Sequence, residues 1–579
     1  MKPLLLGLLL LLFLSAAHGV DQHARDAEFA VLIASIQRGS SDRGMNEKDQ
    51  LLADRFHAHG PAAIPYLLPL LESKKEHLRN FAGYVLRDQT GLTEQHLPAL
   101  IKGYQRGSEW LPPAIGRIGT PAAVEFLIAD LKARPQTSTQ VTYAMELVGE
   151  PAVPYLVALL DTRVTASEDL SQVLCQILSE LKSERAAELL LNTASGRKAG
   201  LTNRLYAVEN IGCVGSRAQR VIPGLQKLAS AEPAKFGPAV SAAIMRIGSA
   251  QSVPYFVEAL RADARMVTFR SLAALGDDAI TAGPVLVEFL VNPDPEVRLG
   301  AARALGLIGH RPAAHHLLPL LAEPDDWRLA FAAAESLGRL RAQQAIPALD
   351  QLATRHWYPP VRDAARFAIQ VIRGDAIHPL PQQVSPMAFY EFNTPGTVAV
   401  RSSGTRPTFV NATHALTPGA LEKLKYHIRP PTGRRGDRRA RSATISPGTG
   451  MKVPEGYLVG RDSGEFGGEL VYLTEQSSAT ILLKENTRAI YRMPFGILAV
   501  TGLAHLGLND GALFLVMPIE SGGYTARRWK TLPGAPGVSG MLDNGKLFIA
   551  TLGGDVVITP EGTIEMAVNR PALDRREAP

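Results

Sequence analysis

The chain has 579 residues, more than one ordinary domain needs, and its 46% hydrophobic content is enough to fill a large core. Its two cysteines, Cys175 and Cys213, exclude a fold held together by a framework of disulfides. The formal net charge of +6 comes from one segment, because Lys423 to Arg441 contains eight basic residues and one acidic residue, which leaves the remaining chain close to neutral.

The N-terminus is typical of a secretory signal. Lys2 precedes an apolar stretch from Leu4 to Leu14, and Ala17-His-Gly19 supplies small residues for cleavage after Gly19. The alternative is an uncleaved membrane anchor, but the apolar stretch is shorter than the roughly 20 residues that a bilayer requires. No cysteine follows the stretch, which argues against a lipoprotein. We expect residues 1–19 to be removed and the mature protein to be exported to the periplasm or the extracellular space.

A helical unit of about thirty residues recurs between Ala24 and Gly374, and Asn292 to Gly309 contains its clearest copy. Each unit has an Ala/Leu-rich helix, a turn, and a second helix that opens with proline. A unit this short cannot bury its own apolar face, so the copies must stack into an α-solenoid over residues 24–375. The aligned turn positions are Gly119, Gly149, Lys182, Gly212, Gly248, Gly276, Gly309 and Leu340, and the prolines are Pro65, Pro154, Pro223, Pro254, Pro284 and Pro347.

These units resemble HEAT repeats of the short, bilin-lyase-like kind, most specifically between Gly248 and Arg373. Copies near the N-terminus are degenerate, as in Arg79 to Gly91. Some members of that superfamily are di-iron hydroxylases, which use repeated His-Glu dipeptides as metal ligands. This sequence contains no His-Glu dipeptide, so that iron site cannot be carried over.

The two cysteines occupy different positions in adjacent repeats. Cys175 lies seven residues before the turn at Lys182, whereas Cys213 directly follows Gly212. Residues out of phase in this way are not expected to bring their Cα atoms within bridging distance, about 7 Å. We therefore favour two buried free thiols over a disulfide.

The periodicity changes after Gly374. We expect a linker at residues 376–386, a β-rich domain at residues 387–570, and a disordered tail at residues 571–579. The β region contains ten to twelve short strands, and Asp543-Asn-Gly545 predicts a hairpin turn. Residues 541–566 weakly resemble one blade of a bacterial β-propeller. The sequence leaves a partial propeller, a sandwich and a barrel open, so the predicted fold class is multidomain α + β.

The basic segment lies within this β region, as a mobile insertion at residues 423–442 that is rich in proline and glycine. It either is a solvated loop or contacts an anionic surface such as acidic polysaccharide or lipid headgroups. Nucleic acid is not expected, since the segment has no interleaved aromatic residues. The residues proposed for anionic contact are Arg434, Arg435, Arg438, Arg439 and Arg441.

One aromatic cluster is a candidate partner-binding site. Trp327-Arg328 and His356-Trp357-Tyr358 lie about thirty residues apart, so repeat symmetry should place them side by side on one edge of the solenoid. Trp, Tyr and Arg are enriched at binding hot spots. The alternative is that these side chains close the last repeats against the β domain.

Catalytic residues, metal ligands and cofactor motifs are not predicted. Arg461-Asp-Ser-Gly464 faintly resembles the nucleophile loop of trypsin-like proteases, whose other catalytic residues lie on β-barrel strands that helices replace here. His315 and His316 are adjacent on a helix and point about 100° apart, which does not suit one metal ion. We therefore expect a non-catalytic exported scaffold that holds a protein or glycan partner. A lyase- or hydrolase-type enzyme, with a site between the two domains, is the alternative.

Overall fold

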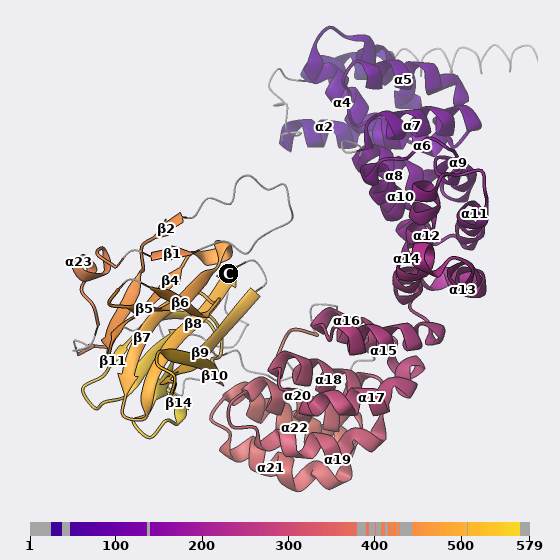
Figure 1. The fold of residues 1–579 in the computed structure, drawn as a ribbon. Coiled ribbons are helices and arrows are strands. Elements are labelled where there is room, and N and C mark those ends of the chain that lie inside the picture. Colours follow the sequence, from indigo (N-terminus) through magenta and orange to yellow (C-terminus); the bar gives the residue numbers. More distant parts are fainter. Residues whose placement is uncertain are drawn as a thin grey trace, which may run out of the picture. The chain divides into compact units, whose positions relative to one another are not determined.

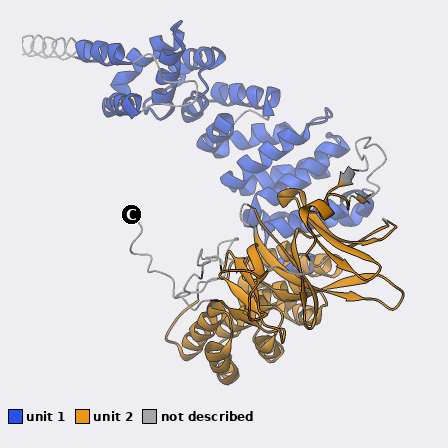
Figure 2. Ribbon diagram, turned by 90° about the vertical axis from the view of Figure 1, so that its left-hand side faces the viewer, with its two compact units in different colours: residues 1–255 blue, residues 256–579 orange. Residues whose placement is uncertain are grey.

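The computed structural model describes residues 25–36, 47–135, 139–378, 389–392, 400, 407–410, 415–424, 426–428, 443–476, 478–505 and 508–567. The expected signal peptide, the C-terminal tail and most of the linker lie outside these residues. The chain divides into two compact units, residues 1–255 and residues 256–579 (Figure 2). This division falls inside the predicted solenoid and groups its last repeats with the β domain.

The first unit consists of paired helices. One helix of each pair packs on its counterpart in the next pair, from α4 to α14 (Figure 1). These first helices are α4 (Glu76–Arg87), α6 (Pro112–Ile118), α8 (Thr139–Val148), α10 (Glu168–Leu181), α12 (Leu201–Cys213) and α14 (Pro233–Ile247). The second helices are α5 (Leu97–Gln105), α7 (Pro121–Ala133), α9 (Val153–Ala158), α11 (Glu184–Ser195) and α13 (Ile222–Ala231), preceded by residues 25–35, α2 (Glu47–Ala58) and α3 (Ile64–Leu67). The next second helix, α15 (Val253–Ala262), crosses the boundary between the two units.

The predicted turn chemistry is confirmed at most positions. All six prolines are the second residue of their helices, where a backbone N–H has no intrahelical acceptor to lose. Six of the eight aligned turn residues have positive φ, including Gly309 at 70°. The other two alignments were wrong by a few residues. Gly212 lies inside α12, and the left-handed residue is Gly215. Leu340 has a right-handed conformation, and the left-handed residue is Arg341.

One continuous apolar core runs through the first unit from Phe29 to Ile247. Successive first helices approach closely because small residues lie between them. A Cβ on Gly116 would meet the backbone of Ala144, and one on Gly212 would meet Ala243. These glycines are therefore required by helix packing rather than by backbone conformation.

Cys175 and Cys213 form a disulfide, with Cα atoms 5.3 Å apart, so the expectation of free thiols was wrong. Elsewhere, residues that meet between successive first helices are about thirty positions apart, as for Gly306 and Ser336. Between α10 and α12 the separation is 38 for the cysteines and 39 for the hydrogen-bonded Ser171 and Asn210. Because the left-handed turn residues Lys182 and Gly215 are 33 positions apart, the pairing of α10 with α12 is offset by five residues from the repeat, and this offset brings the two sulfur atoms together.

The second unit begins with the last helical repeats. Their first helices pack in order as α16 (Met266–Ala273), α18 (Pro295–Leu307), α20 (Trp327–Arg339) and α22 (Pro359–Arg373). The second helices are α17 (Gly283–Glu288), α19 (Ala314–Leu317) and α21 (Ile346–Arg355). Ala301, Ala302 and Ala304 are fully buried in α18, as small residues between packed helices should be.

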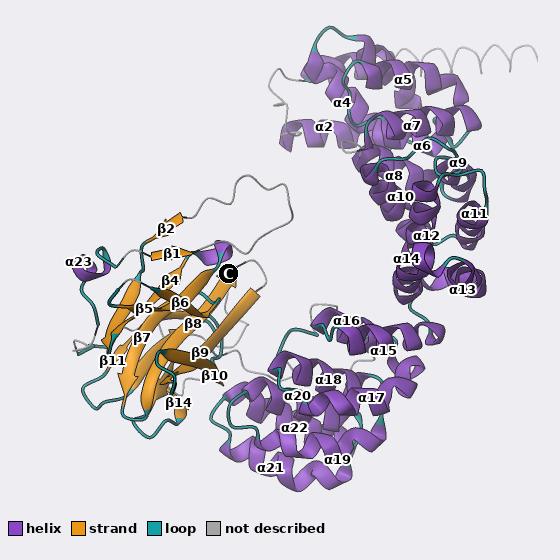
Figure 3. Ribbon diagram, viewed as in Figure 1, coloured by secondary structure: helices purple, strands orange, loops and turns teal. Residues whose placement is uncertain are grey.

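The β domain contains three four-stranded antiparallel sheets, each with its strands in chain order (Figure 3). A two-stranded sheet, β1–β2, and the short helix α23 (Pro418–Leu421) precede them. The strands are β1 (Tyr426–Ile428), β2 (Ala443–Ile445), β3 (Thr449–Val453), β4 (Gly456–Asp462), β5 (Gly468–Thr474), β6 (Ala479–Leu483), β7 (Thr487–Met493), β8 (Gly496–His505), β9 (Leu508–Pro518), β10 (Tyr524–Thr531), β11 (Pro536–Met541), β12 (Leu547–Thr551), β13 (Val556–Ile558) and β14 (Ile564–Met566).

The sheet of β7 to β10 is buried on both faces. Ile497 and Ala499 pack into one apolar cluster with the β3–β6 sheet, whereas Leu498 and Val500 pack into another with the β11–β14 sheet. This alternation follows from the period of two along a strand. The described residues form fourteen strands, more than the ten to twelve predicted, because the short β1–β2 pair adds to three four-stranded sheets. The hairpin turn at Gly545 is confirmed, and the domain is a stack of three blade-like sheets.

Candidate binding sites on the helical repeats

The predicted aromatic cluster lies where the last repeats meet the β domain. Trp327 is the first residue of α20, and its side chain is 6% exposed. Its indole Nε1 donates a hydrogen bond to the main-chain oxygen of Leu532, at 3.2 Å. Beside it, the main-chain N–H of Thr531 donates to the oxygen of Asp325 at 2.9 Å, and Lys530 Nζ lies 3.1 Å from the Asp325 carboxylate. Trp327 thus binds the β domain of its own chain.

Arg328 is held at the same helix terminus by carboxylates. Its Nε and Nη2 donate to the two oxygens of Asp326, at 2.9 and 2.7 Å, and Nη2 also pairs with Glu296 at 2.6 Å. Burial works against the ionised carboxylate of Asp326, yet the charge and hydrogen bonds of Arg328 lower its pKa below the usual value. The Arg328 guanidinium is therefore engaged in a buried ion pair that caps α20.

The other three predicted residues complete this contact. Tyr358 is buried, stacks edge-on against Trp327 with ring centroids 4.6 Å apart, and donates its hydroxyl to the main-chain oxygen of Gly553 at 3.2 Å. Trp357 packs on the apolar cluster of the β domain and stacks on His356. Burial lowers the pKa of His356 to about 4. The repeats do bring the cluster together, but the burial of Trp327 and Tyr358 contradicts an exposed edge and agrees with the alternative of closure residues.

A second arrangement at this junction was not predicted. Arg303 of α18 is 3% exposed, and its guanidinium donates to the main-chain oxygens of Phe389 and Glu391, at 2.5 Å for Glu391. It also lies over the ring of Phe392, 4.4 Å from the centroid. We call residues 389–392 the clamped segment. In the sequence, the arginine at position 303 of an alanine-rich helix was the signal that could have indicated this contact.

The clamped segment is held on three successive first helices. Arg270 of α16 lies over the Tyr390 ring at 5.6 Å. On α20, the rings of Trp327 and Phe331 contact Phe392, with centroids 4.8 and 5.4 Å apart. The face of the repeats that carries Arg270 and Arg303 thus binds a stretch of polypeptide through main-chain oxygens and aromatic side chains.

Arg270 and Arg303 occupy the same position in their repeats, six residues before the left-handed turn residues Gly276 and Gly309. In the first unit, the same position holds Tyr143 on α8, Gln176 on α10 and Glu209 on α12. All three side chains are exposed, and Tyr143 is 42% exposed. In the second unit the clamped segment covers this face at Arg270 and Arg303, whereas the side chains at the three equivalent positions of the first unit are exposed.

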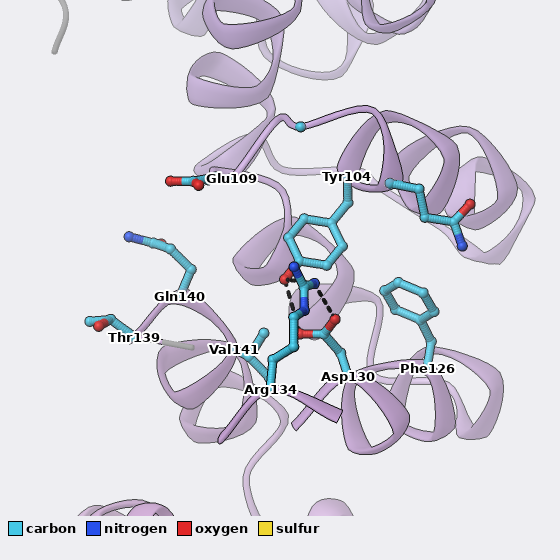
Figure 4. A pocket seen from close by; sticks show the side chains of 10 residues that line it. Tyr104, Glu109, Phe126, Asp130, Arg134, Thr139, Gln140 and Val141 are labelled. Carbon is cyan, nitrogen blue, oxygen red and sulfur yellow. Dashed lines mark hydrogen bonds and ion pairs between the residues drawn. The ribbon is translucent and has the colours of Figure 1, made fainter. Parts of the chain in front are cut away.

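A polar cavity of about 460 Å³ lies in the first unit between the second helices α5 and α7 and the start of the first helix α8 (Figure 4). Tyr104 at the end of α5, Asp130 of α7 and Arg134 form its connected wall. The Tyr104 hydroxyl donates to Asp130 at 2.9 Å and accepts from Arg134 Nη2 at 2.9 Å, while Arg134 also pairs with Asp130. Burial and the Asp130 carboxylate raise the pKa of Tyr104 to about 12, so its hydroxyl stays protonated.

The opposite wall of the cavity carries polar side-chain groups without a hydrogen-bond or ion-pair partner among the described residues. Figure 4 shows Glu109, Thr139 and Gln140 across from Tyr104 and Arg134. No hydrogen bond or ion pair from the described residues reaches the Glu109 carboxylate. The Oε1 atom of Gln140 is buried without a hydrogen-bond partner among those residues. The Glu109 carboxylate and the Gln140 oxygen are both hydrogen-bond acceptors.

Aromatic rings and an arginine lie at the end of α4 and in the turn before α6. The guanidinium of Arg87, at the end of α4, lies over the rings of Tyr84 and Trp110, 4.9 and 5.4 Å from their centroids. Tyr143 lies close enough to Arg87 to interact with it electrostatically. These residue types are the ones that dominate protein interfaces.

Carboxylates continue along the same layer of helices. Burial and the nearby Glu180 of α10 raise the pKa of Glu146 on α8. On α12, burial together with Glu168 and Glu209 raises the pKa of Tyr206. We call Glu146, Glu168, Glu180 and Glu209 the acidic stripe. Among the described residues, no cation forms an ion pair with these four carboxylates.

The remaining predicted site residues are placed as follows. Arg434, Arg435, Arg438, Arg439 and Arg441 lie outside the described residues. His315 and His316 are exposed neighbours, and the described residues contain no group of three side chains suited to a metal ion. No helix in the described part of the chain is long and apolar enough to cross a membrane.

Comparison with known families identifies the repeats. Residues 283–370 match the family model for HEAT repeats. The chain contains HEAT repeats. A comparison with curated protein sequences finds no match.

Three solved structures resemble parts of the chain. Human deoxyhypusine hydroxylase in complex with glycerol is 18% identical, with 44% of this chain and 96% of that chain covered and a TM-score of 0.18. The complex of CpcE and CpcF of phycocyanin lyase from Nostoc sp. PCC7120 is 20% identical, with 39% and 92% covered and a TM-score of 0.22. Importin beta is 14% identical, with 62% and 55% covered and a TM-score of 0.34. At these values the likenesses carry no argument about function.

Proposed function

We propose that this protein is an exported, non-catalytic scaffold whose HEAT repeats hold a polypeptide partner along their first helices. The observation that carries the proposal is the clamped segment. The repeats bind residues 389–392 through Arg303 and the main-chain oxygens of Phe389 and Glu391. Main-chain oxygens are common to every polypeptide, so the same face suits a segment of another protein.

The first unit offers that face to a partner. Tyr143, Gln176 and Glu209 take the positions of Arg270 and Arg303, and the described structure leaves them exposed. The stack of Arg87 on Tyr84 and Trp110 lies close to Tyr143 and adds rigid aromatic surface. Such groups bury large areas at a low cost in conformational entropy. A glycan partner is the alternative occupant of this surface, and the experiment below separates the two.

Two observations support export. The N-terminal stretch from Leu4 to Leu14, followed by small residues at Ala17 and Gly19, has the pattern of a cleaved signal. The Cys175–Cys213 disulfide is the kind of bond that persists in oxidising compartments and is rare in the cytosol. The two observations are independent, since one lies in the leader and the other in the helical repeats.

The non-catalytic part of the proposal rests on the junction between the last repeats and the β domain. Trp327, Arg328 and Tyr358 make contacts within the chain there, and His356 is buried beside them. These contacts support a structural joint. We further propose that the basic segment at residues 423–442 contacts an anionic polysaccharide or lipid surface, on the basis of its charge.

Site-specific cross-linking tests the partner-binding face. A photoreactive phenylalanine at Tyr143 should cross-link a protein in an envelope extract, and the same group at Tyr155 of α9, in the layer of second helices, should not. Digestion of the adduct with a protease should remove the added mass. Equal cross-linking from both positions, an adduct that resists protease but yields to glycosidases, or no adduct at Tyr143 would each overturn the proposal.

A further inference from the structure

We propose that the cavity between Glu109 and Arg134 binds a lysine or arginine side chain of a basic polypeptide segment, and that the rest of the segment follows the acidic stripe. The inference rests on the proposed function and names the chemistry of its partner. The two walls of the cavity differ, because the polar groups of one wall are paired with each other and those of the other wall lack partners.

On one wall the charges cancel. Asp130 is paired with Arg134 and accepts from the Tyr104 hydroxyl, so neither side chain needs a ligand. The Arg134 guanidinium also lies over the Tyr104 ring, 5.3 Å from its centroid, and Phe126 meets that ring edge-on at 6.0 Å. This wall is a rigid, nearly neutral surface that suits the methylene groups of a long side chain.

On the other wall the groups are acceptors. Glu109 is an exposed carboxylate that forms no ion pair with a described residue, although it lies close enough to act on both Tyr104 and Arg134. Gln140 adds a buried oxygen without a donor. Leaving such an acceptor unpaired costs about 1–3 kcal/mol, so a ligand that donates hydrogen bonds is favoured. An ammonium or guanidinium supplies both the charge and the donors.

The size of the cavity agrees with one side chain. Its volume of about 460 Å³ lies in the lower part of the range of small-ligand pockets. An extended lysine or arginine side chain fits inside it with room left for water, and the main chain of the partner stays outside on the surface of α8. We therefore expect an anchor residue rather than a buried peptide.

The neighbouring surface continues the same charge preference. Thr139 and Gln140 at the start of α8 line the cavity, and Glu146 lies near the end of the same helix, beside Glu180 of α10. A second group of carboxylates, Glu168 at the start of α10 and Glu209 of α12, lies around Tyr206. Mutual repulsion among these carboxylates is relieved when cations lie between them. The anchored segment is thus expected to carry further basic residues along the stripe.

Binding of a defined peptide tests the proposal. The probe is a fluorescein-labelled twelve-residue peptide in which arginine and lysine alternate with glycine and serine, and its control has glutamine at every basic position. The basic probe should bind the mature protein, and the neutral probe should bind at least tenfold more weakly. Glu109→Gln should weaken binding of the basic probe about tenfold, and Glu180→Gln about threefold. Glu188→Gln, on α11 of the second layer, carries the same loss of charge and should leave binding unchanged.

Each contrary result is informative. Equal weakening by Glu109→Gln and Glu188→Gln would show unspecific attraction and overturn the proposal, as would tight binding of the neutral probe. Sedimentation that shows self-association abolished by deleting residues 430–442 would replace the separate partner with a second copy of this chain. If the photoreactive group at Tyr143 still cross-links a protein while the basic probe fails to bind, this inference is wrong and the proposed function stands. If no cross-link forms, the proposed function and this inference are both wrong.

Discussion

The indole nitrogen of Trp327 lies 3.2 Å from the main-chain oxygen of Leu532, and this hydrogen bond joins the last HEAT repeat to the β domain across 205 residues of sequence. It is buried, and it is flanked by the bond from Thr531 to Asp325 and by the ion pair of Lys530 with Asp325. The two parts of the second unit are therefore expected to unfold together.

Trp327→Phe tests this joint, since it keeps an aromatic ring and removes the donor. Loss of the bond leaves the Leu532 oxygen unpaired, so we expect the free energy of unfolding to fall by about 1–3 kcal/mol. Trp327→Ala should cost about 3–5 kcal/mol, because it also opens a cavity. The matched control is Trp529→Phe, since the ring of Trp529 packs on Phe495. This substitution should lower the free energy of unfolding by less than Trp327→Phe does. Denaturant titrations measure all three, and an unchanged midpoint in Trp327→Phe would contradict the joint.

Arg303→Met removes the guanidinium that holds the clamped segment. The oxygens of Phe389 and Glu391 lose their donors, and Glu335 loses one of the cations that keep its pKa low against the effect of burial. We expect a loss of about 3–5 kcal/mol, as for a broken buried ion pair. Limited proteolysis should then cleave near Tyr390 before the rest of the chain. Arg311→Met, at an exposed position, should leave stability and the cleavage pattern unchanged.

Stability should fall as the solution becomes acidic. Burial lowers the pKa of His356 and of His378 to about 4, below the usual histidine value of 6.5. Between these pH values the unfolded chain binds more protons than the folded chain, so the stabilisation is complete above pH 6.5 and is lost as the pH falls toward 4. Each histidine contributes up to about 3 kcal/mol to this change.

His356→Asn is the variant that checks this dependence. Its side-chain oxygen takes the place of Nδ1, which accepts from the Tyr358 main-chain N–H at 3.0 Å, and asparagine does not titrate. Melting temperatures measured from pH 7.5 to pH 5 should depend less on pH in this variant than in the parent. His315→Asn, at an exposed site, should retain the parental slope. A slope unaffected by His356→Asn would show that this histidine is not the titrating group.

The disulfide closes a loop of 38 residues between α10 and α12. Chain entropy predicts a stabilisation of about 4 kcal/mol for a loop of this length. The paired substitution of both cysteines by serine should lower the melting temperature of the first unit, and a reductant should do the same to the parent protein. Mass spectrometry under non-reducing conditions should detect no free thiol, and two alkylated cysteines in the native protein would contradict the bond.

Deletion of Arg434 to Arg441 tests the basic segment. A surface segment contributes few packed contacts, so we expect the free energy of unfolding to change by less than about 1 kcal/mol. Binding to acidic liposomes or to an acidic polysaccharide should decrease, and salt should weaken the binding of the intact chain. Binding that is insensitive to salt, or unfolding on deletion, would contradict an electrostatic surface role.

The starts and ends of helices and the strands of the β domain can be predicted from the sequence without a structure. Prolines such as Pro154 and Pro284 start helices, Gly119 and Gly309 end them, and the run from Leu547 to Met566 forms the strands that its pattern predicts. These features depend on neighbours within a few residues. They therefore established the repeats and the division into a helical and a β region.

The associations between distant parts required the tertiary structure. The slip of α12 along α10 decided that Cys175 and Cys213 form a disulfide, although the turn alignment placed them out of phase. Contact with Leu532 decided that Trp327 is a joint within the chain, and contact with Phe389 gave Arg303 its role. Helical periodicity specifies which face of a helix is apolar, whereas the axial offset between two helices, and the segment that covers a face, follow from packing between residues far apart in sequence.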